Sequence, residues 1–123
     1  MENLDLRCAE LGSKLAGLEA VDEKLLTDAL AVLEEQGLYA YFLFLAARGK
    51  DGHRRVSATS AEFLRSTPQG APLLLGDGDP LAAVRQLVTN LDSLLFARDL
   101  LGQALVYGRY HAKAKAVSVG ADG

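Results

Sequence analysis

The side chains that most often act as a nucleophile or a general base are scarce in this chain. It has one cysteine, Cys8, and two histidines, His53 and His111. Cys8 falls on an apolar helical stripe, His53 falls in a glycine- and arginine-rich segment, and His111 falls near basic residues. The sequence pairs none of them with the second group that nucleophilic or acid–base catalysis needs. We therefore predict that the protein is not an enzyme.

Motifs for phosphate or metal binding are incomplete. The stretch "LLLGDGDP", residues 73–80, contains glycines but lacks the Lys-Ser/Thr of a phosphate-binding loop and the glycine spacing of a dinucleotide site. Its Asp-Gly-Asp lacks the later ligands and the terminal glutamate of a calcium loop. One cysteine cannot form an internal disulfide, and with two histidines it leaves little for zinc. We expect no metal, no cofactor and no small-molecule substrate.

Charge is unevenly distributed along the 123 residues, whose formal net charge is −3. Residues 1–47 hold nine acidic and three basic side chains, whereas residues 48–123 hold seven acidic and ten basic ones. Such an asymmetry can orient a protein against a polyanion or a charged partner. The same pattern also arises from the solvated faces of ordinary helices.

Two groups of cations are candidates for binding phosphates. One lies in "RGKDGHRR", residues 48–55, which we interpret as a basic loop because Gly49 and Gly52 suit turns. The other lies on a predicted C-terminal helix, where 100° per residue places three cations on one side as a basic ridge. Cations near a helix C-terminus also complement the helix dipole without binding anything. The candidate residues are Lys50, Arg54, Arg55, Arg98, Arg109 and Lys113.

The elements that position these cations are predicted to be helical. Apolar residues recur at helical spacing over residues 4–18 and 21–35, and Gly37 suits the end of the second helix. Asp79 followed by Pro80 is typical of a helix start.

Two further helix starts are predicted from capping residues. Thr59 and Glu62 match a capping box for a short helix. Asp92 is expected to cap a last helix over about residues 93–113.

The stretch "QGLYAYFLFLAARGK", residues 36–50, is apolar on every side of a helix and on both faces of a strand. It is shorter than the roughly 20 apolar residues of a membrane span. Because every other segment is predicted to be helical, we interpret it as the buried central helix of a bundle, with tyrosine hydroxyls at its edge. Part of its apolar surface could instead pack on a neighbouring subunit.

Together these patterns predict an all-α fold. We expect a compact single-domain bundle of about five to six helices over residues 1–116, followed by a disordered tail at 117–123. A long Gly/Pro-rich connection at residues 67–79 should be attached to the core by Leu73–Leu75. Residues 1–30 show no secretory signal, so we expect a cytoplasmic protein with no membrane contact.

Three blocks occur in an order that resembles the small helical subunit of the type III-B CRISPR effector, the Cmr complex. They are "LRCAE", "EEQGLYAYFLFLAARGK" and "LLFARDLLGQALVYGRYHAKA". The family's early arginine-alanine pair would correspond to Arg7 and Ala9, and its Gly-Leu step to Gly37 and Leu38. Its apolar helix would correspond to Phe42–Leu45 followed by Lys50, and its aromatic and basic C-terminal end to Tyr107–Lys113.

The resemblance implies a non-catalytic filament subunit in antiviral defence, present in several copies beside the other subunits of an RNA-guided complex. It would contact the backbone of guide and target RNA, and the six candidate cations would be its RNA-binding residues. Sequence-independent phosphate contacts suit a complex in which base pairing already determines sequence specificity.

Two other classes remain open. One is a free-standing helical adaptor or regulator that binds a protein through its acidic half, without nucleic acid. The other is a helix-turn-helix DNA-binding protein, for which the last helix offers only Gln103 as a base-reading side chain.

Overall fold

The all-α prediction is confirmed. A computed structural model describes residues 2–76, 78–87 and 89–122, and over these ranges the chain forms six α-helices and no strand. The helices are α1 (Leu4–Ala16), α2 (Glu23–Gln36), α3 (Leu38–Arg48), α4 (Asp51–Ser66), α5 (Pro80–Leu87) and α6 (Leu91–Asp122).

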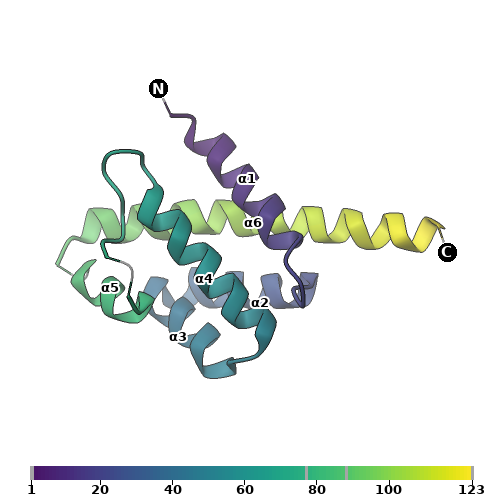
Figure 1. The fold of residues 1–123 in the computed structure, drawn as a ribbon, viewed down its shortest axis with the longest axis horizontal. Coiled ribbons are helices and arrows are strands. Elements are labelled where there is room, and N and C mark those ends of the chain that lie inside the picture. The colour runs from purple at the N-terminus through teal and green to yellow at the C-terminus, as the bar shows by residue number, and fades with distance from the viewer. Residues whose placement is uncertain (1, 77, 88, 123) are drawn as a thin grey trace.

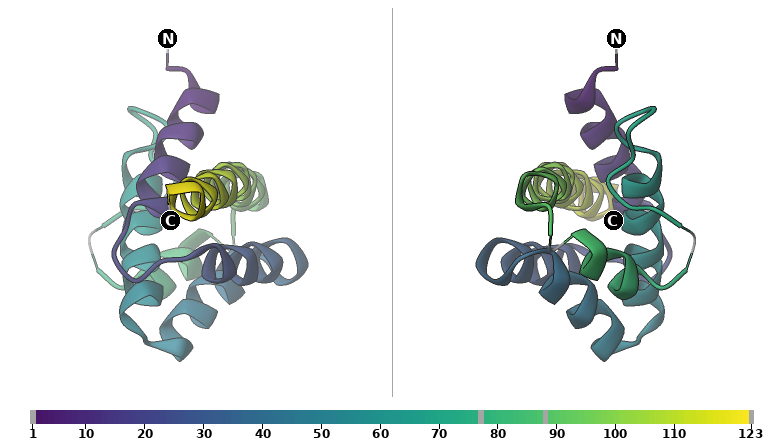
Figure 2. Two further views of the ribbon diagram at one scale, coloured as in Figure 1. Left: turned by 90° about the vertical axis from the view of Figure 1, so that its right-hand side faces the viewer. Right: turned by 90° about the vertical axis from the view of Figure 1, so that its left-hand side faces the viewer.

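The longest helix, α6, organises the bundle. It runs along the long dimension of the molecule, and its C-terminal part extends beyond the other helices (Figure 1). Viewed along α6, helices α1 and α4 lie on one side and α2 on the other (Figure 2). The most extensive helix–helix contacts are those of α6 with α1 and with α2. A single apolar core results, because each shorter helix turns its apolar stripe toward its neighbours.

Helices α1 and α2 follow the predicted stripes and begin at side-chain caps. Asn3 Oδ1 accepts a hydrogen bond from the Leu6 amide at 3.0 Å, and Asp22 Oδ1 accepts one from the Leu25 amide at 2.9 Å. Gly37 ends α2 with a φ of 97°, a value that suits glycine best, so its predicted role as a stop is confirmed.

Helix α3 confirms the helical interpretation of the apolar run but is not buried on every side. Tyr41 is fully buried, and its hydroxyl lies 2.8 Å from the Ser60 hydroxyl in the core rather than at an edge. The Tyr39 hydroxyl does reach the surface, where it accepts a hydrogen bond from Arg85 at 2.9 Å. Leu43 is 47% exposed, although α3 contacts α2, α4, α5 and, less extensively, α6.

The prediction of a loop at residues 48–55 is wrong. Only Gly49, with a φ of 63°, and the extended Lys50 separate α3 from α4, so residues 51–55 are the first turn and a half of a helix. Gly52 is required there for close packing, because an added Cβ would collide with the Ala20 carbonyl oxygen. The capping box at Thr59 and Glu62 is also wrong, since both residues lie in the middle of α4.

The segment between α4 and α5 contains no helix or strand among its described residues, 67–76 and 78–79. The Leu73 and Leu74 amides donate to the Leu64 carbonyl at 2.9 and 3.1 Å, and both side chains are buried. Leu75, by contrast, is 68% exposed. Attachment to the core is therefore confirmed for two of the three predicted leucines.

Of the two caps predicted for the last two helices, one is correct and one is wrong. Asp79 Oδ1 accepts a hydrogen bond from the Leu81 amide at 3.1 Å, which confirms it as a cap. The cap of α6 is Asn90, whose Oδ1 accepts from the Ser93 amide at 3.1 Å, rather than Asp92, which lies within the helix. The helical spacing of Leu81, Val84, Leu87 and Val88 predicts that they face the core; Val84 is buried, and Val88 lies outside the described residues.

The structure describes α6 as helical through Asp122, where the sequence predicted a disordered tail from residue 117. Alanine and lysine, which favour helix, dominate the residues just before this segment. Gly123 lies outside the described residues. No helix of the part described is both long and apolar enough to cross a membrane.

Candidate nucleic-acid interface

The basic ridge forms on the side of α6 that faces α2. Arg109 and Lys113, one helical turn apart, line a hollow of about 230 Å³ together with Val106, Tyr110 and Glu23. The first four residues follow the spacing of one helix face, and Glu23 contributes the opposite wall from the first turn of α2. The structure thus brings two of the six candidate cations together.

Arg109 and Tyr110 give this hollow unused binding capacity. The Arg109 Nε atom is shielded from solvent and has no hydrogen-bond partner. Buried polar atoms are usually hydrogen-bonded, so Arg109 has donor capacity that the described residues do not use. The Tyr110 side chain is 70% exposed, whereas Tyr41 on α3 is fully buried.

Arg98 does not join the other two cations of the ridge. Its guanidinium donates to the Glu34 carbonyl, one of the last four carbonyls of α2, which have no partner within the helix. Arg98 also lines a separate hollow of about 420 Å³ with Glu34 and Asp99. Its structural role is therefore to cap the C-terminal end of α2.

The second group of cations lies at the start of α4. Lys50 is the exposed N-cap residue, and Arg54 is exposed on the first turns. Arg55 is engaged, because its Nε lies 3.0 Å from Asp51 Oδ2 and its guanidinium lies 3.9 Å from Glu19. The hydrogen bond with Asp51 also raises the pKa of Arg55. Among the described residues, Lys50 and Arg54 form no ion pair.

A mixed-charge hollow of about 420 Å³ adjoins this second group. Its lining includes Arg48, Lys50 and His53, together with Asp22 and other charged residues of α2. Desolvation lowers the pKa of His53, and the charges of Arg48 and Lys50 lower it further. The ring of Phe44 packs edge-on against it, with centroids 5.8 Å apart.

The first turn of α2 separates the two cationic groups. Glu23 lines the hollow on α6, while the adjacent Asp22 lines the one at α4. These carboxylates reduce the local positive potential near Arg109 and near Lys50. The six predicted cations therefore form two small groups with acidic neighbours rather than one continuous basic surface.

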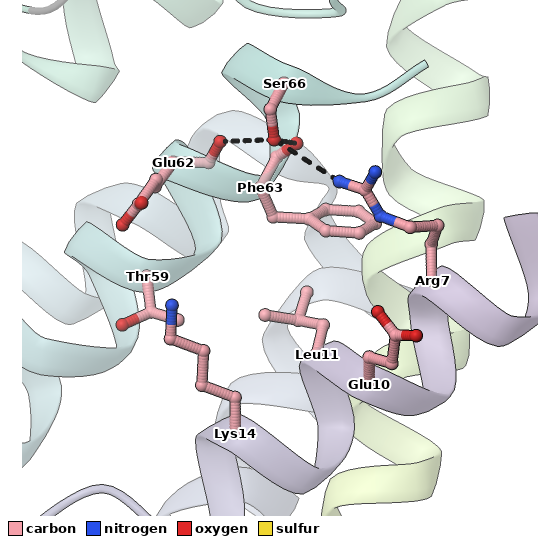
Figure 3. A pocket seen from close by; sticks show the side chains of 8 residues that line it. All are labelled: Arg7, Glu10, Leu11, Lys14, Thr59, Glu62, Phe63 and Ser66. Atoms are coloured by element: carbon pink, nitrogen blue, oxygen red, sulfur yellow. Dashed lines mark hydrogen bonds between the residues drawn. The ribbon is translucent and has the colours of Figure 1, made fainter. Parts of the chain in front are cut away.

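Another hollow, of about 320 Å³, lies between α1 and α4 and was not predicted (Figure 3). Leu11 and Phe63, both almost fully buried, contribute apolar surface beneath polar and charged side chains. The Arg7 guanidinium lies over the Phe63 ring, 5.9 Å from its centroid, and donates to Thr67 Oγ1 at 2.8 Å. The other residues that line this hollow are Glu10, Lys14, Thr59, Glu62 and Ser66.

The catalytic candidates remain apart. Cys8 is buried between α1 and α6, where its thiol donates to the Leu100 carbonyl at 3.4 Å. Burial raises the pKa of this thiol to about 11, which disfavours the nucleophilic thiolate. His111 is exposed on α6. Within the described part of the chain, no group of three His, Cys, Asp or Glu side chains is arranged to hold a metal.

Sequence reasoning missed Tyr110 and Glu23. The spacing of residues 106, 109, 110 and 113 does mark one face of a helix, and this signal could have included Tyr110 with the two cations. Nothing in the sequence indicates that α2 would place Glu23 opposite them. In comparisons with family models, curated proteins and solved structures, the chain has no match.

Proposed function

We propose that this chain is a non-catalytic structural subunit of a type III-B CRISPR ribonucleoprotein complex in antiviral defence. It would work in the cytoplasm, stack with copies of itself and with other subunits, and contact the backbone of guide and target RNA. The cations that suit this role best are Arg109 and Lys113 on α6, with Lys50 and Arg54 at the start of α4.

The observation that carries this proposal is that α6, which holds the third of the three sequence blocks that resemble the Cmr small subunit, packs against the helices that hold the other two. The first block lies in α1, the second spans the end of α2 and all of α3, and the third forms most of α6. Helix α6 packs against α1, α2 and α3. Blocks that are separate in sequence thus contribute to one core, as the parts of one small domain do.

The surface of α6 supports the RNA part of the proposal. Arg109 and Lys113 form no ion pair among the described residues, so their charges are free for phosphates. Phosphate contacts by Arg and Lys are independent of sequence and weaken with salt. Because Glu23 and Asp22 lie nearby, we expect the isolated chain to bind RNA weakly at physiological salt.

Reversal of the charges at Arg109 and Lys113 tests the RNA contact. We expect the complex that carries Arg109→Glu and Lys113→Glu to retain less target RNA, with a thermal midpoint close to that of the wild type. A matched control is Lys14→Glu with Arg85→Glu, which changes net charge equally at exposed sites of α1 and α5, away from both cationic groups. Equal RNA retention by both double variants would refute the proposed contact.

A free-standing adaptor that binds a protein is the second candidate, and the hollow between α1 and α4 favours it. Apolar surface beneath a polar and charged rim is typical of protein interfaces. The acidic neighbours of both cationic groups also suit this alternative. If Lys14→Glu abolished capture of a protein partner while the α6 variant did not, the adaptor would be supported over the RNA-contacting subunit.

A further inference from the structure

We infer that the hollow formed by Arg109, Tyr110, Lys113 and Glu23 accepts one unpaired nucleotide, with the base against Tyr110 and the phosphate at the two cations. This inference rests on the proposed function, because it specifies which form of RNA the same face of α6 binds. It adds a base-contacting residue, Tyr110, and a preference for single-stranded RNA to a set of phosphate contacts.

Tyr110 has the properties of a stacking residue. Its side chain is 70% exposed, and no aromatic pair or cation–π contact occupies its ring among the described residues. Proteins that hold single strands stack bases on aromatic rings of this kind, next to cations that follow the backbone. The hollow, at about 230 Å³, is below the range of drug-sized pockets, so it suits one planar base rather than a larger ligand.

The charges fix the orientation of the nucleotide. A phosphate inside the hollow would lie beside Glu23, whose carboxylate repels it. The same carboxylate accepts hydrogen bonds from an exocyclic amino group, as acidic side chains do from cytosine N4. The base therefore points inward, and the phosphate remains outside, near the charged ends of Arg109 and Lys113. A duplex cannot bind in this way, because its bases are already stacked and paired.

The absence of tryptophan from the chain provides a direct reporter of stacking. In the full-length Tyr110→Trp variant, the indole is the only strong emitter. We would titrate it at about 50 mM salt, where phosphate contacts are least screened. The probes are dye-labelled ten-nucleotide oligocytidylate, oligouridylate of equal length and a ten-base-pair RNA duplex. Dye anisotropy reports binding, and tryptophan emission reports stacking.

We expect oligocytidylate to quench the indole at position 110 and to bind severalfold more tightly than oligouridylate, while any duplex binding leaves the emission unchanged. Tyr110→Ala should weaken oligocytidylate binding about tenfold, in line with the loss of one stacked base. Leu75→Trp is the matched control, because Leu75 is similarly exposed at 68% and lies in the connection before α5. The tryptophan emission of this control should not change when any of the three probes is added.

Two results would overturn the inference. If anisotropy showed oligonucleotide binding that Arg109→Glu weakens, but the emission at position 110 did not change, stacking would be refuted while the phosphate contacts stood. If none of the probes bound at low salt, the hollow would not be a nucleotide site. The proposed subunit role would then be judged separately, by RNA retention in the assembled complex.

Discussion

Gly12 of α1 and Gly108 of α6 face each other where the two helices cross. The Gly12 carbonyl oxygen lies 3.3 Å from the position that a Cβ atom of Gly108 would occupy. A Cβ atom on Gly12 would lie 2.6 Å from Tyr107 Cβ and 2.8 Å from the Gly108 backbone nitrogen. The two glycines therefore permit the close approach of α1 to the helix that carries the candidate RNA interface.

Gly12→Ala is expected to destabilise the protein, because the atoms in its way are backbone or near-backbone atoms that cannot move independently. Overpacking costs about 1–3 kcal/mol, and the better helix propensity of alanine offsets up to about 1 kcal/mol of that. Urea denaturation should show a net loss of about 1–2 kcal/mol. Gly102→Ala is the control: its nearest neighbour would be Leu33 Cδ2 at 3.9 Å, so it should stabilise slightly. Unchanged stability of Gly12→Ala would contradict the crossing.

Burial of the Cys8 thiol makes stability depend on pH in the alkaline range. Its pKa is raised to about 11 in the folded state from a usual value near 9. The folded protein thus binds this proton more tightly than the unfolded chain, so the stabilisation is complete below pH 9 and is lost as pH rises toward 11. Between pH 7.5 and pH 10.5, the free energy of unfolding of the wild type should fall by about 2 kcal/mol more than that of Cys8→Ala.

The measurement is urea unfolding of both proteins at the two pH values. Tyr41, whose pKa burial also raises, is present in both and cancels in the comparison. Equal losses in the two proteins would mean that the Cys8 thiol titrates normally in the folded state.

Arg7 is expected to hold the segment after α4 against α1. Its guanidinium donates to the buried Thr67 at 2.8 Å and to Glu2 at 2.9 Å. Hydrogen bonds of charged groups contribute about 1.5–3 kcal/mol, so Arg7→Gln should speed local opening of this segment at least tenfold. Amide hydrogen exchange at Leu73 and Leu74 measures that opening, with Lys14→Gln as the control on the same helix. Identical exchange in the two variants would exclude this role.

The start of α6 depends on Asn90 rather than on Asp92. Asn90→Ala removes the side-chain acceptor of the Ser93 amide and should cost about 1 kcal/mol of unfolding free energy. Asp92→Ala, within the first turn, should lower the unfolding free energy by at most a few tenths of a kcal/mol, because it removes only a favourable charge at the helix N-terminus. Thermal unfolding of both variants checks the order, and a larger loss for Asp92→Ala would reverse the assignment.

Local patterns predicted the elements that depend on local chemistry. The stripes of α1 and α2, the stop at Gly37 and the start at Asp79 follow from periodicity, positive φ and capping, which a few neighbouring residues determine. The approach failed for residues 51–55, because Gly52 suits a turn as well as a close packing contact inside a helix. Only its approach to Ala20, which is distant in sequence, shows that the second applies.

The candidate site was predictable only within a single helix. Arg109 and Lys113 share a side of α6 because they are four residues apart, which the sequence shows. Arg98 lies on the same side but caps α2, and Glu23 reaches the hollow from α2. These two relationships depend on how α2 packs against α6, and periodicity does not determine which helices become neighbours.

The most direct test of the proposed role is gentle purification of the tagged chain from its own host. Co-purifying proteins would be identified by mass spectrometry, and bound RNA would be sequenced. We predict recovery of larger CRISPR effector subunits together with guide RNAs that carry repeat-derived sequence. Recovery of the chain alone, or with an unrelated protein and no RNA, would contradict the proposed function and favour the adaptor.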